Sequence, residues 1–182
     1  MLKHFSELPA FLFEAPSSTP ARIRFRKARM TDLGPLHRAC FAERPLAQFG
    51  DAFRRSLATQ RHGQGVHLVA DHDTEPIATG QLSAYGASVE IADLAVAPAF
   101  RGQGVGTALI NVLVGIADFA GFDSVEICVM QENTRARELY ERLGFVHDRT
   151  FSLTDKAVGI VLRRPLDEHL RNHPAQGLAH GA

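Results

Sequence analysis

The middle of the chain contains a glycine-rich segment that could bind an anion. Three glycines occupy alternate positions between residues 102 and 106, and Arg101 comes directly before them. Because glycine has no Cβ atom, consecutive backbone N–H groups can point into one concavity, and the positive end of a following helix would add to the attraction. The segment therefore predicts a phosphate or pyrophosphate site, to which Arg101 adds a positive charge.

Two common nucleotide-binding patterns do not fit this spacing. The dinucleotide fingerprint needs a glycine where Thr107 stands, and the phosphate loop of nucleoside triphosphatases needs a Gly-Lys-Ser/Thr run that is missing. Phosphate-dependent binding of ATP or NAD is therefore a weaker alternative. A segment of this kind standing alone could also be a turn that merely lets a strand and a helix pack closely.

The histidines and cysteines form no recognisable ligand set, so we expect no metal site. Several histidines are regularly spaced or would share a helix face, namely His62, His67, His72, His169 and His173. No carboxylate or cysteine completes a set around them, and we expect them on the surface. Cys40 and Cys128 show no pairing pattern. Cys128 falls on a strand that we expect to be buried, which favours inert packing over nucleophilic chemistry.

Composition restricts the possible partners. The 182 residues include 20 basic and 20 acidic side chains, so the formal net charge is zero. This removes the long-range attraction that nucleic-acid and acidic-membrane binders use, and we expect neither partner. Glu7 and Glu14 interrupt the apolar N-terminal residues, and no stretch approaches the length of about 20 apolar residues that a membrane span needs. We expect a cytoplasmic protein without a recognisable export signal.

Hydrophobic periodicity predicts alternating strands and helices around the glycine-rich segment. The expected elements are a strand at 22–27, helices at 32–40 and 46–57, strands at 67–71, 77–84 and 88–96, a helix at 107–120, a strand at 124–130, a helix at 134–143, and a hairpin of strands at 146–153 and 157–163. The helix at 107–120 is apolar nearly all round and should be buried. Thr31 and Asn133 are expected helix caps, and the arginines of the first strand should form a solvated face.

Three runs of residues around the glycines resemble the GNAT superfamily of acetyl-CoA-dependent N-acetyltransferases. They are Leu94-Ala95-Val96-Ala97-Pro98 with Arg101-Gly102-Gln103-Gly104-Val105-Gly106, then Asn133-Thr134-Arg135-Ala136, and finally Leu139-Tyr140-Glu141-Arg142-Leu143-Gly144-Phe145. The resemblance covers roughly residues 22–166. It implies an α/β fold with a mixed, mostly antiparallel sheet flanked by helices, in which the parallel strands at 88–96 and 124–130 splay apart.

The resemblance also implies how acetyl-CoA would bind. The pantetheine arm would enter the gap between the splayed strands and bond to their backbone much as an added strand would. The pyrophosphate would rest on the amides that begin the buried helix. The implied cofactor-binding residues are Leu94, Ala95, Val96, Arg101, Gly102, Gln103, Gly104, Val105, Gly106, Thr107 and Asn133.

Two side chains match catalytic positions of the superfamily. Tyr140 stands where many members carry the general acid that protonates the departing thiolate. Glu90 stands where some members place a carboxylate that draws the amine proton through water. Asp93 or solvent is the alternative base, and regular strand alternation places Glu90 on the face of Leu94, with Asp93 on the other face unless a bulge changes the register.

The resemblance implies direct acetyl transfer to a primary amine, on a small molecule or a peptide, in a ternary complex. The acceptor cannot be read from the sequence. The alternative function is a non-catalytic acyl-CoA-binding module that senses metabolite level or regulates a partner.

Both ends of the chain lie outside the resemblance. Residues 1–20 form an arm that carries Phe5, Leu8 and further aromatic residues ahead of a proline-rich linker, residues 21–166 form the acetyltransferase domain, and residues 167–182 form a polar tail. Such apolar side chains should be buried on this subunit or on a second one. We expect a homodimer in which the arm covers a neighbouring surface.

Overall fold

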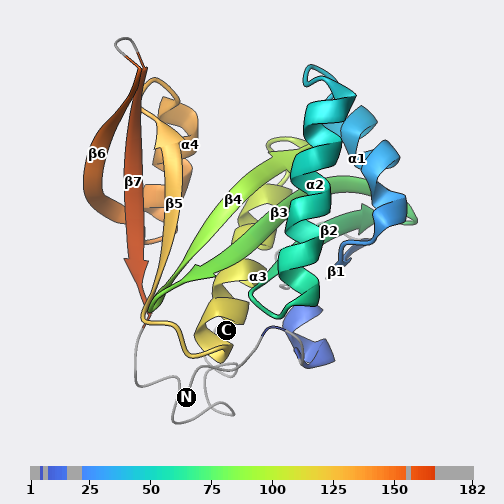
Figure 1. Ribbon diagram of the computed structural model, residues 1–182, viewed down its shortest axis with the longest axis horizontal. Helices are drawn as coiled ribbons and strands as arrows, with labels where there is room; N and C mark the ends of the chain where they lie inside the picture. The colour runs from blue at the N-terminus through green and yellow to red at the C-terminus, as the bar shows by residue number, and fades with distance from the viewer. Residues whose placement is uncertain (1–4, 6–7, 16–21, 155–156, 167–182) are drawn as a thin grey trace.

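The fold is built on a seven-stranded sheet (Figure 1). The computed structural model describes residues 5, 8–15, 22–154 and 157–166. The strands are β1 (Ile23–Lys27), β2 (Gly65–His72), β3 (Glu75–Tyr85), β4 (Ser88–Val96), β5 (Ser124–Met130), β6 (Val146–Thr154) and β7 (Ala157–Pro165). They follow the order β1-β2-β3-β4-β5-β7-β6, and all neighbours are antiparallel except β4 and β5. The expected mixed, mostly antiparallel α/β fold is confirmed.

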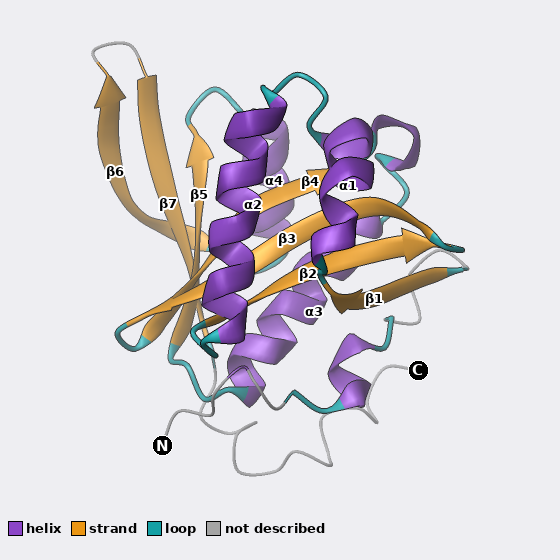
Figure 2. Ribbon diagram, turned by 45° about the vertical axis from the view of Figure 1, so that its right-hand side comes forward, coloured by secondary structure: helices purple, strands orange, loops and turns teal. Residues whose placement is uncertain are grey.

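Helices cover both faces of this sheet (Figure 2). Within the described residues they are α1 (Leu33–Cys40), α2 (Leu46–Arg61), α3 (Val105–Phe119) and α4 (Thr134–Arg142), with short 3-10 turns η2 (Ala10–Phe13), η3 (Met30–Asp32) and η4 (Pro98–Phe100). Helices α1 and α2 lie over β2 and β3 on one face, and α3 and α4 lie on the opposite face. In this part of the chain no helix is long and apolar enough to span a membrane.

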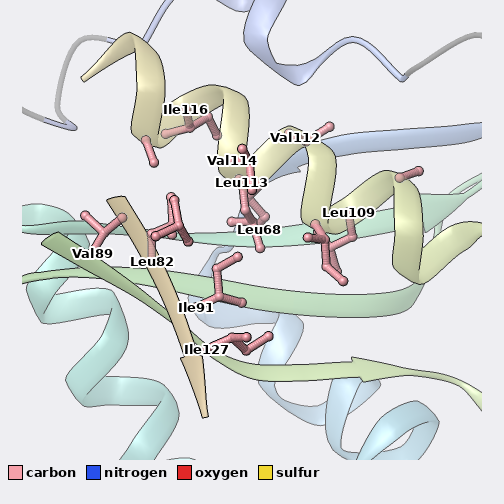
Figure 3. Close-up of a cluster of buried hydrophobic side chains, with 14 of the residues drawn as sticks. Leu68, Leu82, Val89, Ile91, Leu109, Val112, Leu113, Val114, Ile116 and Ile127 are labelled. Atoms are coloured by element: carbon pink, nitrogen blue, oxygen red, sulfur yellow. The ribbon is translucent and has the colours of Figure 1, made fainter. Parts of the chain in front are cut away.

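The main hydrophobic core lies between α3 and strands β2 to β5 (Figure 3). Leu109, Leu113 and Ile116 of α3 are fully buried. They lie among strand side chains that include Leu68, Leu82, Val89, Ile91 and Ile127. The nearly all-apolar sequence of α3 thus reflects its burial, as predicted, although the helix begins at Val105 rather than Thr107.

The parallel pair β4 and β5 separates along its length. The strands are paired only from Ser88 to Ile91 on β4 and from Ser124 to Ile127 on β5. Beyond these residues they diverge toward their C-terminal ends (Figure 1). The expected splay is therefore present, and the β4 edge from residue 92 to 96 has no strand partner on the β5 side within the described chain.

A β-bulge interrupts β4 at the start of this unpaired edge. Gln81 is opposite Ala92 and Thr79 is opposite Ala95, so Asp93 and Leu94 together face a single residue of β3. Asp93 adopts a left-handed conformation with φ of 47°. The extra residue reverses the alternation that follows it. This bulge changes the register of β4, which regular alternation of side chains along the sequence could not show.

The structure corrects the expected cap of the first helix and part of the expected face of the first strand. Asp32, not Thr31, is the residue directly before α1, and its carboxylate accepts hydrogen bonds from the Arg29 backbone N–H and from Arg26. Arg26 also pairs with Asp71 at 2.6 Å. Both carboxylates are buried. The expected solvated face of β1 is present at Arg22 and Arg24, which are exposed, whereas Arg26 belongs to an internal ion-pair network.

His67 is buried, in contrast to the expected surface position. Its side chain lies between α2 and β3, with Nδ1 2.6 Å from the Ser56 hydroxyl and Nε2 2.7 Å from the Thr79 hydroxyl. Burial lowers the pKa of this imidazole to about 4. The Thr79 hydroxyl also donates to the Leu68 carbonyl at 2.8 Å, and the Ser56 hydroxyl donates to the Phe53 carbonyl at 2.9 Å. His169 and His173 lie outside the described residues.

The described part of the N-terminal arm packs on its own domain. Phe5 is only 1% exposed and stacks on Phe122 at 5.5 Å between ring centroids. Leu8 and Phe13 also pack against the main core. The apolar contacts of Phe5, Leu8 and Phe13 are therefore within their own chain, whereas the side chains of Phe11 and Leu12 lie outside what the structure describes, and the homodimer stays a prediction. The linker at 16–20 and the tail at 167–182 lie outside the described residues.

Candidate active site

The glycine-rich segment forms the turn into α3. Gly102 and Gly104 adopt φ of 76° and 83°, and Gly104 is the N-cap of the helix. These left-handed conformations favour glycine and leave no side chain over the helix terminus. Within the described residues, the N–H groups of Val105, Gly106 and Thr107 make no hydrogen bond. The helix thus presents free donors, together with the positive end of its dipole, to a ligand.

The end of β4 lies directly against this turn. A Cβ atom at Gly106 would meet the Val96 side chain at 3.6 Å. The Ala97 N–H donates to the Ile77 carbonyl on β3. The N–H and C=O groups of the preceding residue, Val96, therefore point away from β3 and toward the gap between β4 and β5. The Arg101 Nε–H donates to the Val96 carbonyl at 2.9 Å. Of the expected cofactor residues, those at 94–96 and 101–107 are therefore brought together.

Asn133 lies at the start of α4, after the end of β5. Its Oδ1 accepts a hydrogen bond from the Ala136 N–H at 3.2 Å, which confirms the expected N-cap. Its side-chain amide nitrogen has no partner among the described residues. The cap fixes the side chain at the open end of the gap and leaves the N–H donors of that amide available.

Tyr140 is on α4, on the core side of the sheet. It is 8% exposed, and its ring centroid lies 6.1 Å from that of Phe145. Burial raises the pKa of the phenol above its ordinary value. The hydroxyl has no hydrogen-bond partner within the described residues. Tyr140 is thus held protonated at neutral pH with its O–H free to donate.

Glu90 lies on the opposite face of the sheet from the main core, next to the gap. Its carboxylate has no hydrogen-bond partner among the described residues. Burial raises its pKa, and the negative charge of Glu126 adds to the effect. A Cβ atom at Gly80 would lie 3.0 Å from the side chain of Leu94 and 3.1 Å from that of Leu113, which is on α3. Leu94 of β4 therefore lies on the α3 face of the sheet, opposite Glu90.

Asp93 shares the face of Glu90, contrary to the placement from regular alternation. Its carboxylate accepts hydrogen bonds from Gln81 at 3.0 Å and from Arg44 at 3.2 Å. Arg44 lies between α1 and α2, so this carboxylate is directed to that side of the sheet. Because both Asp93 oxygens are engaged, Glu90 is the freer of the two candidate bases.

A cavity of about 470 Å³ opens beside Glu90. Its lining comes from five strands: Tyr85, Glu90, Glu126, Ile127, Cys128, Arg149, Phe151 and Val161. The parallel register places Glu90 opposite Glu126, and the antiparallel register places Cys128 opposite Val161. The cavity therefore lies across β4 and β5 on the face opposite α3 and α4, where the strands begin to separate.

Glu126 is held ionised by its neighbours. It is buried, which opposes ionisation, but hydrogen bonds from Arg149 at 2.8 Å and from the Tyr85 hydroxyl bring its pKa below the ordinary value. The second guanidinium nitrogen of Arg149 bonds Asp148 at 2.6 Å. Burial and the bond to Glu126 raise the pKa of Tyr85 to about 12. Arg149 is thus shared between two carboxylates.

The cavity contains residues that the sequence analysis did not select. Cys128 is exposed, so the prediction that it is buried is wrong. Its neighbours Ile127 and Val129 are buried, which places the thiol on the cavity face of β5. The available signal was the alternation Glu126, Ile127, Cys128 combined with the parallel pairing of β4 and β5. Arg149 and Phe151 on β6 carried no local signal. Within the described residues no cluster could hold a metal ion.

Comparisons with known proteins agree with this geometry. The model of the Acetyltransferase (GNAT) family matches residues 30–145. An uncharacterized N-acetyltransferase of Methanocaldococcus jannaschii is 50% identical over 56 residues, which are 31% of this chain and 25% of that protein. A mycothiol acetyltransferase of Beutenbergia cavernae is 44% identical over 59 residues, 32% of this chain and 20% of that protein. The chain thus matches only a quarter or less of the length of these relatives.

Solved structures show the same fold. A ribosomal L7/L12 alpha-N-protein acetyltransferase in complex with coenzyme A has a TM-score of 0.69 at 12% identity, with 82% of this chain and 97% of that chain covered. The ribosomal-protein-S18-alanine N-acetyltransferase from Escherichia coli has a TM-score of 0.65 at 18% identity, with 80% and 94% covered.

Proposed function

Because the chain belongs to the acetyltransferase (GNAT) family, we propose that it transfers the acetyl group of acetyl-CoA directly to a primary amine. The observation that carries this proposal is the gap between β4 and β5. Free helix amides lie at one end of the gap, and a cavity lined by Glu90 lies beside it. A donor bound from the first side and an amine bound from the second would meet between the strands.

The chain's own groups fit the phosphate-bearing donor. The amides of Val105, Gly106 and Thr107 would hold the pyrophosphate at the positive end of α3. The unpaired β4 edge at Leu94 to Val96 offers backbone groups to the pantetheine arm, and Asn133 offers an amide from the other side of the gap. When bound, acetyl-CoA supplies an activated acyl group as a thioester.

Tyr140 and Glu90 would handle the protons of the transfer. Formation of the C–N bond breaks the C–S bond, and Tyr140 protonates the leaving thiolate. The substrate ammonium loses two protons: Glu90 accepts the first, which leaves a neutral amine, and the second restores the phenol of Tyr140. The raised pKa of Glu90 makes it a stronger base than an ordinary surface carboxylate.

A matched pair of variants tests the donor site by calorimetry. Gly104→Asn and Gly104→Asp have similar side chains and both tolerate a left-handed conformation, but only aspartate brings a negative charge to the helix terminus. We expect the aspartate variant to bind coenzyme A at least about tenfold more weakly than the asparagine variant. Equal affinities of the two folded variants would contradict the assignment. ATP and NAD serve as control ligands that should bind poorly.

Transfer itself is tested by following thiol release from acetyl-CoA over a panel of amines. Amine-dependent thiol release with formation of the acetylated amine would support an enzyme. Coenzyme A binding without transfer to any amine would favour the alternative function, a non-catalytic acyl-CoA-binding module.

A further inference from the structure

The cavity beside Glu90 points to the chemical class of the acceptor. We propose that the acceptor is a small primary amine with an apolar body and without a carboxylate. This inference rests on the proposed function, because it assigns the cavity to the amine substrate. It is carried by the composition of the cavity walls and by the way their charges are paired.

One wall of the cavity is an aromatic ring that lies over a glycine of the neighbouring strand. Phe151 lies opposite Gly159 in the β6–β7 pairing. A Cβ atom at Gly159 would meet the Phe151 ring at 2.5 Å, so the ring lies directly over the glycine. Phe151 keeps 37% of its surface exposed and lines the cavity together with Val161 and Cys128. These groups form an apolar surface against which an aliphatic or aromatic body would pack.

The charged groups of the cavity favour a cation. Arg149 is the one cationic residue among the described residues that line the cavity, and its guanidinium is bonded to Glu126 and Asp148. Glu90 carries the carboxylate that has no hydrogen-bond partner among the described residues. An ammonium group next to Glu90 would therefore complete the charge pairing of the cavity.

The same pairing disfavours a substrate carboxylate. Two carboxylates, on Glu90 and Glu126, face the cavity, and a third anion there would be repelled. A carboxylate that approached the remaining N–H groups of Arg149 would share a guanidinium that already bonds Glu126 and Asp148, and it would lie close to both of these carboxylates. Competition for the guanidinium would also weaken the bond that stabilises the charge of the buried Glu126, which is costly. Free amino acids should therefore be poor acceptors compared with amines of the same shape.

Three acceptors with the same phenyl body test this selection in the thiol-release assay. They are 2-phenylethylamine, phenylalaninamide and phenylalanine. We expect 2-phenylethylamine to exceed phenylalanine in kcat/KM by at least about tenfold, with phenylalaninamide closer to 2-phenylethylamine. Equal or better use of phenylalanine would overturn the proposal and would mean that Arg149 binds the carboxylate. Better use of a tripeptide amide that begins with phenylalanine would overturn it in favour of a peptide acceptor.

A pair of variants on β6 tests the apolar wall. Phe151→Ala should raise KM for 2-phenylethylamine by about tenfold or more with little change in kcat, and should leave ethylamine nearly unaffected. Leu153→Ala is the matched control, because Leu153 is on the same strand, 52% exposed, and outside the cavity lining. An equal effect of both variants on 2-phenylethylamine and ethylamine would contradict the placement of the body.

Alkylation of Cys128 separates this inference from the proposed function. With coenzyme A present, 2-phenylethylamine should slow the reaction of Cys128 with iodoacetamide by about twofold when the cavity is half occupied. An added free thiol such as N-acetylcysteine is the reference, since burial raises the pKa of Cys40 to about 11 and makes that thiol slow to alkylate. Protection without acetyl transfer would leave the acceptor class standing and refute the transferase. Acetylation of 2-phenylethylamine without protection of Cys128 would refute this cavity as the acceptor site.

Discussion

The buried imidazole of His67 should make stability depend on pH in a specific way. Burial lowers its pKa from 6.5 to about 4, while the charges of Asp93 and Asp32 act weakly in the opposite direction. In the unfolded chain the group titrates at its ordinary value. Between these two pKa values the unfolded state binds more protons, so the free energy of unfolding falls as the pH is lowered.

The size of the effect follows from the pKa difference. At 1.36 kcal/mol per pKa unit, the histidine should reduce the free energy of unfolding by about 2 kcal/mol at pH 5 and about 3 kcal/mol at pH 4, relative to pH 8. Above pH 7 its contribution should no longer change with pH. Other groups also titrate in this range, so the measured quantity is the difference between the parent protein and a variant.

Urea unfolding of the parent and of His67→Gln at pH 8, 6 and 5 measures that difference. Glutamine keeps hydrogen-bonding groups near Ser56 and Thr79 but cannot be protonated. Any fixed cost of the substitution should therefore shrink by about 2 kcal/mol between pH 8 and pH 5. His62→Gln, at the exposed end of α2, is the control and should show no such change. A constant difference between the parent and His67→Gln would refute the reasoning.

Further changes test the site and the arm. Tyr140→Phe should lower kcat by about a hundredfold while coenzyme A affinity stays nearly constant in calorimetry; unchanged kcat with chemistry rate-limiting would exclude a proton donor. Glu90→Gln should depress kcat/KM most at low pH, where the amine is protonated, and least at high pH; a loss independent of pH would indicate positioning instead. Phe5→Ala should lower the free energy of unfolding by about 3 kcal/mol or more with solution mass and coenzyme A affinity unchanged; parent-like urea unfolding would show that the arm is passive.

Local patterns accounted for most of the fold. The cap at Asn133, the apolar helix α3 and the hairpin of β6 and β7 each depend on neighbouring residues, so a single sequence was sufficient to predict them. The start of α1 was predicted one residue too early because Asp32 and Thr31 are both good capping residues. The ion pairs of Arg26 with Asp32 and Asp71 could not be predicted, since Asp71 is distant in sequence.

The candidate site was predictable where it follows a contiguous motif. The glycines and the β4 end before them lie together as expected. Glu90 and Asp93 share a face of the sheet because of the bulge in β4. The sequence does not mark this bulge with a glycine, since Asp93 itself takes the left-handed conformation that is more usual for glycine. The exposure of Cys128 depended on which face of β5 the helices leave uncovered. The acceptor cavity combines five strands and therefore has no contiguous sequence signature.

The short pairing between β4 and β5 has a mechanical consequence. In the described sheet, strand pairing connects the half formed by β1 to β4 with the half formed by β5 to β7 through only four residue pairs. Along the rest of their length, β4 and β5 can move apart without breaking any strand pairing. Amide hydrogens of residues 92–96 that face the gap should therefore exchange with solvent faster than those bonded to β3. An extended molecule lying in the gap would join the halves along their whole length. Its arrival should be visible as slowed exchange on both sides at once, and this stiffening would fix the walls of the neighbouring cavity before the second substrate binds.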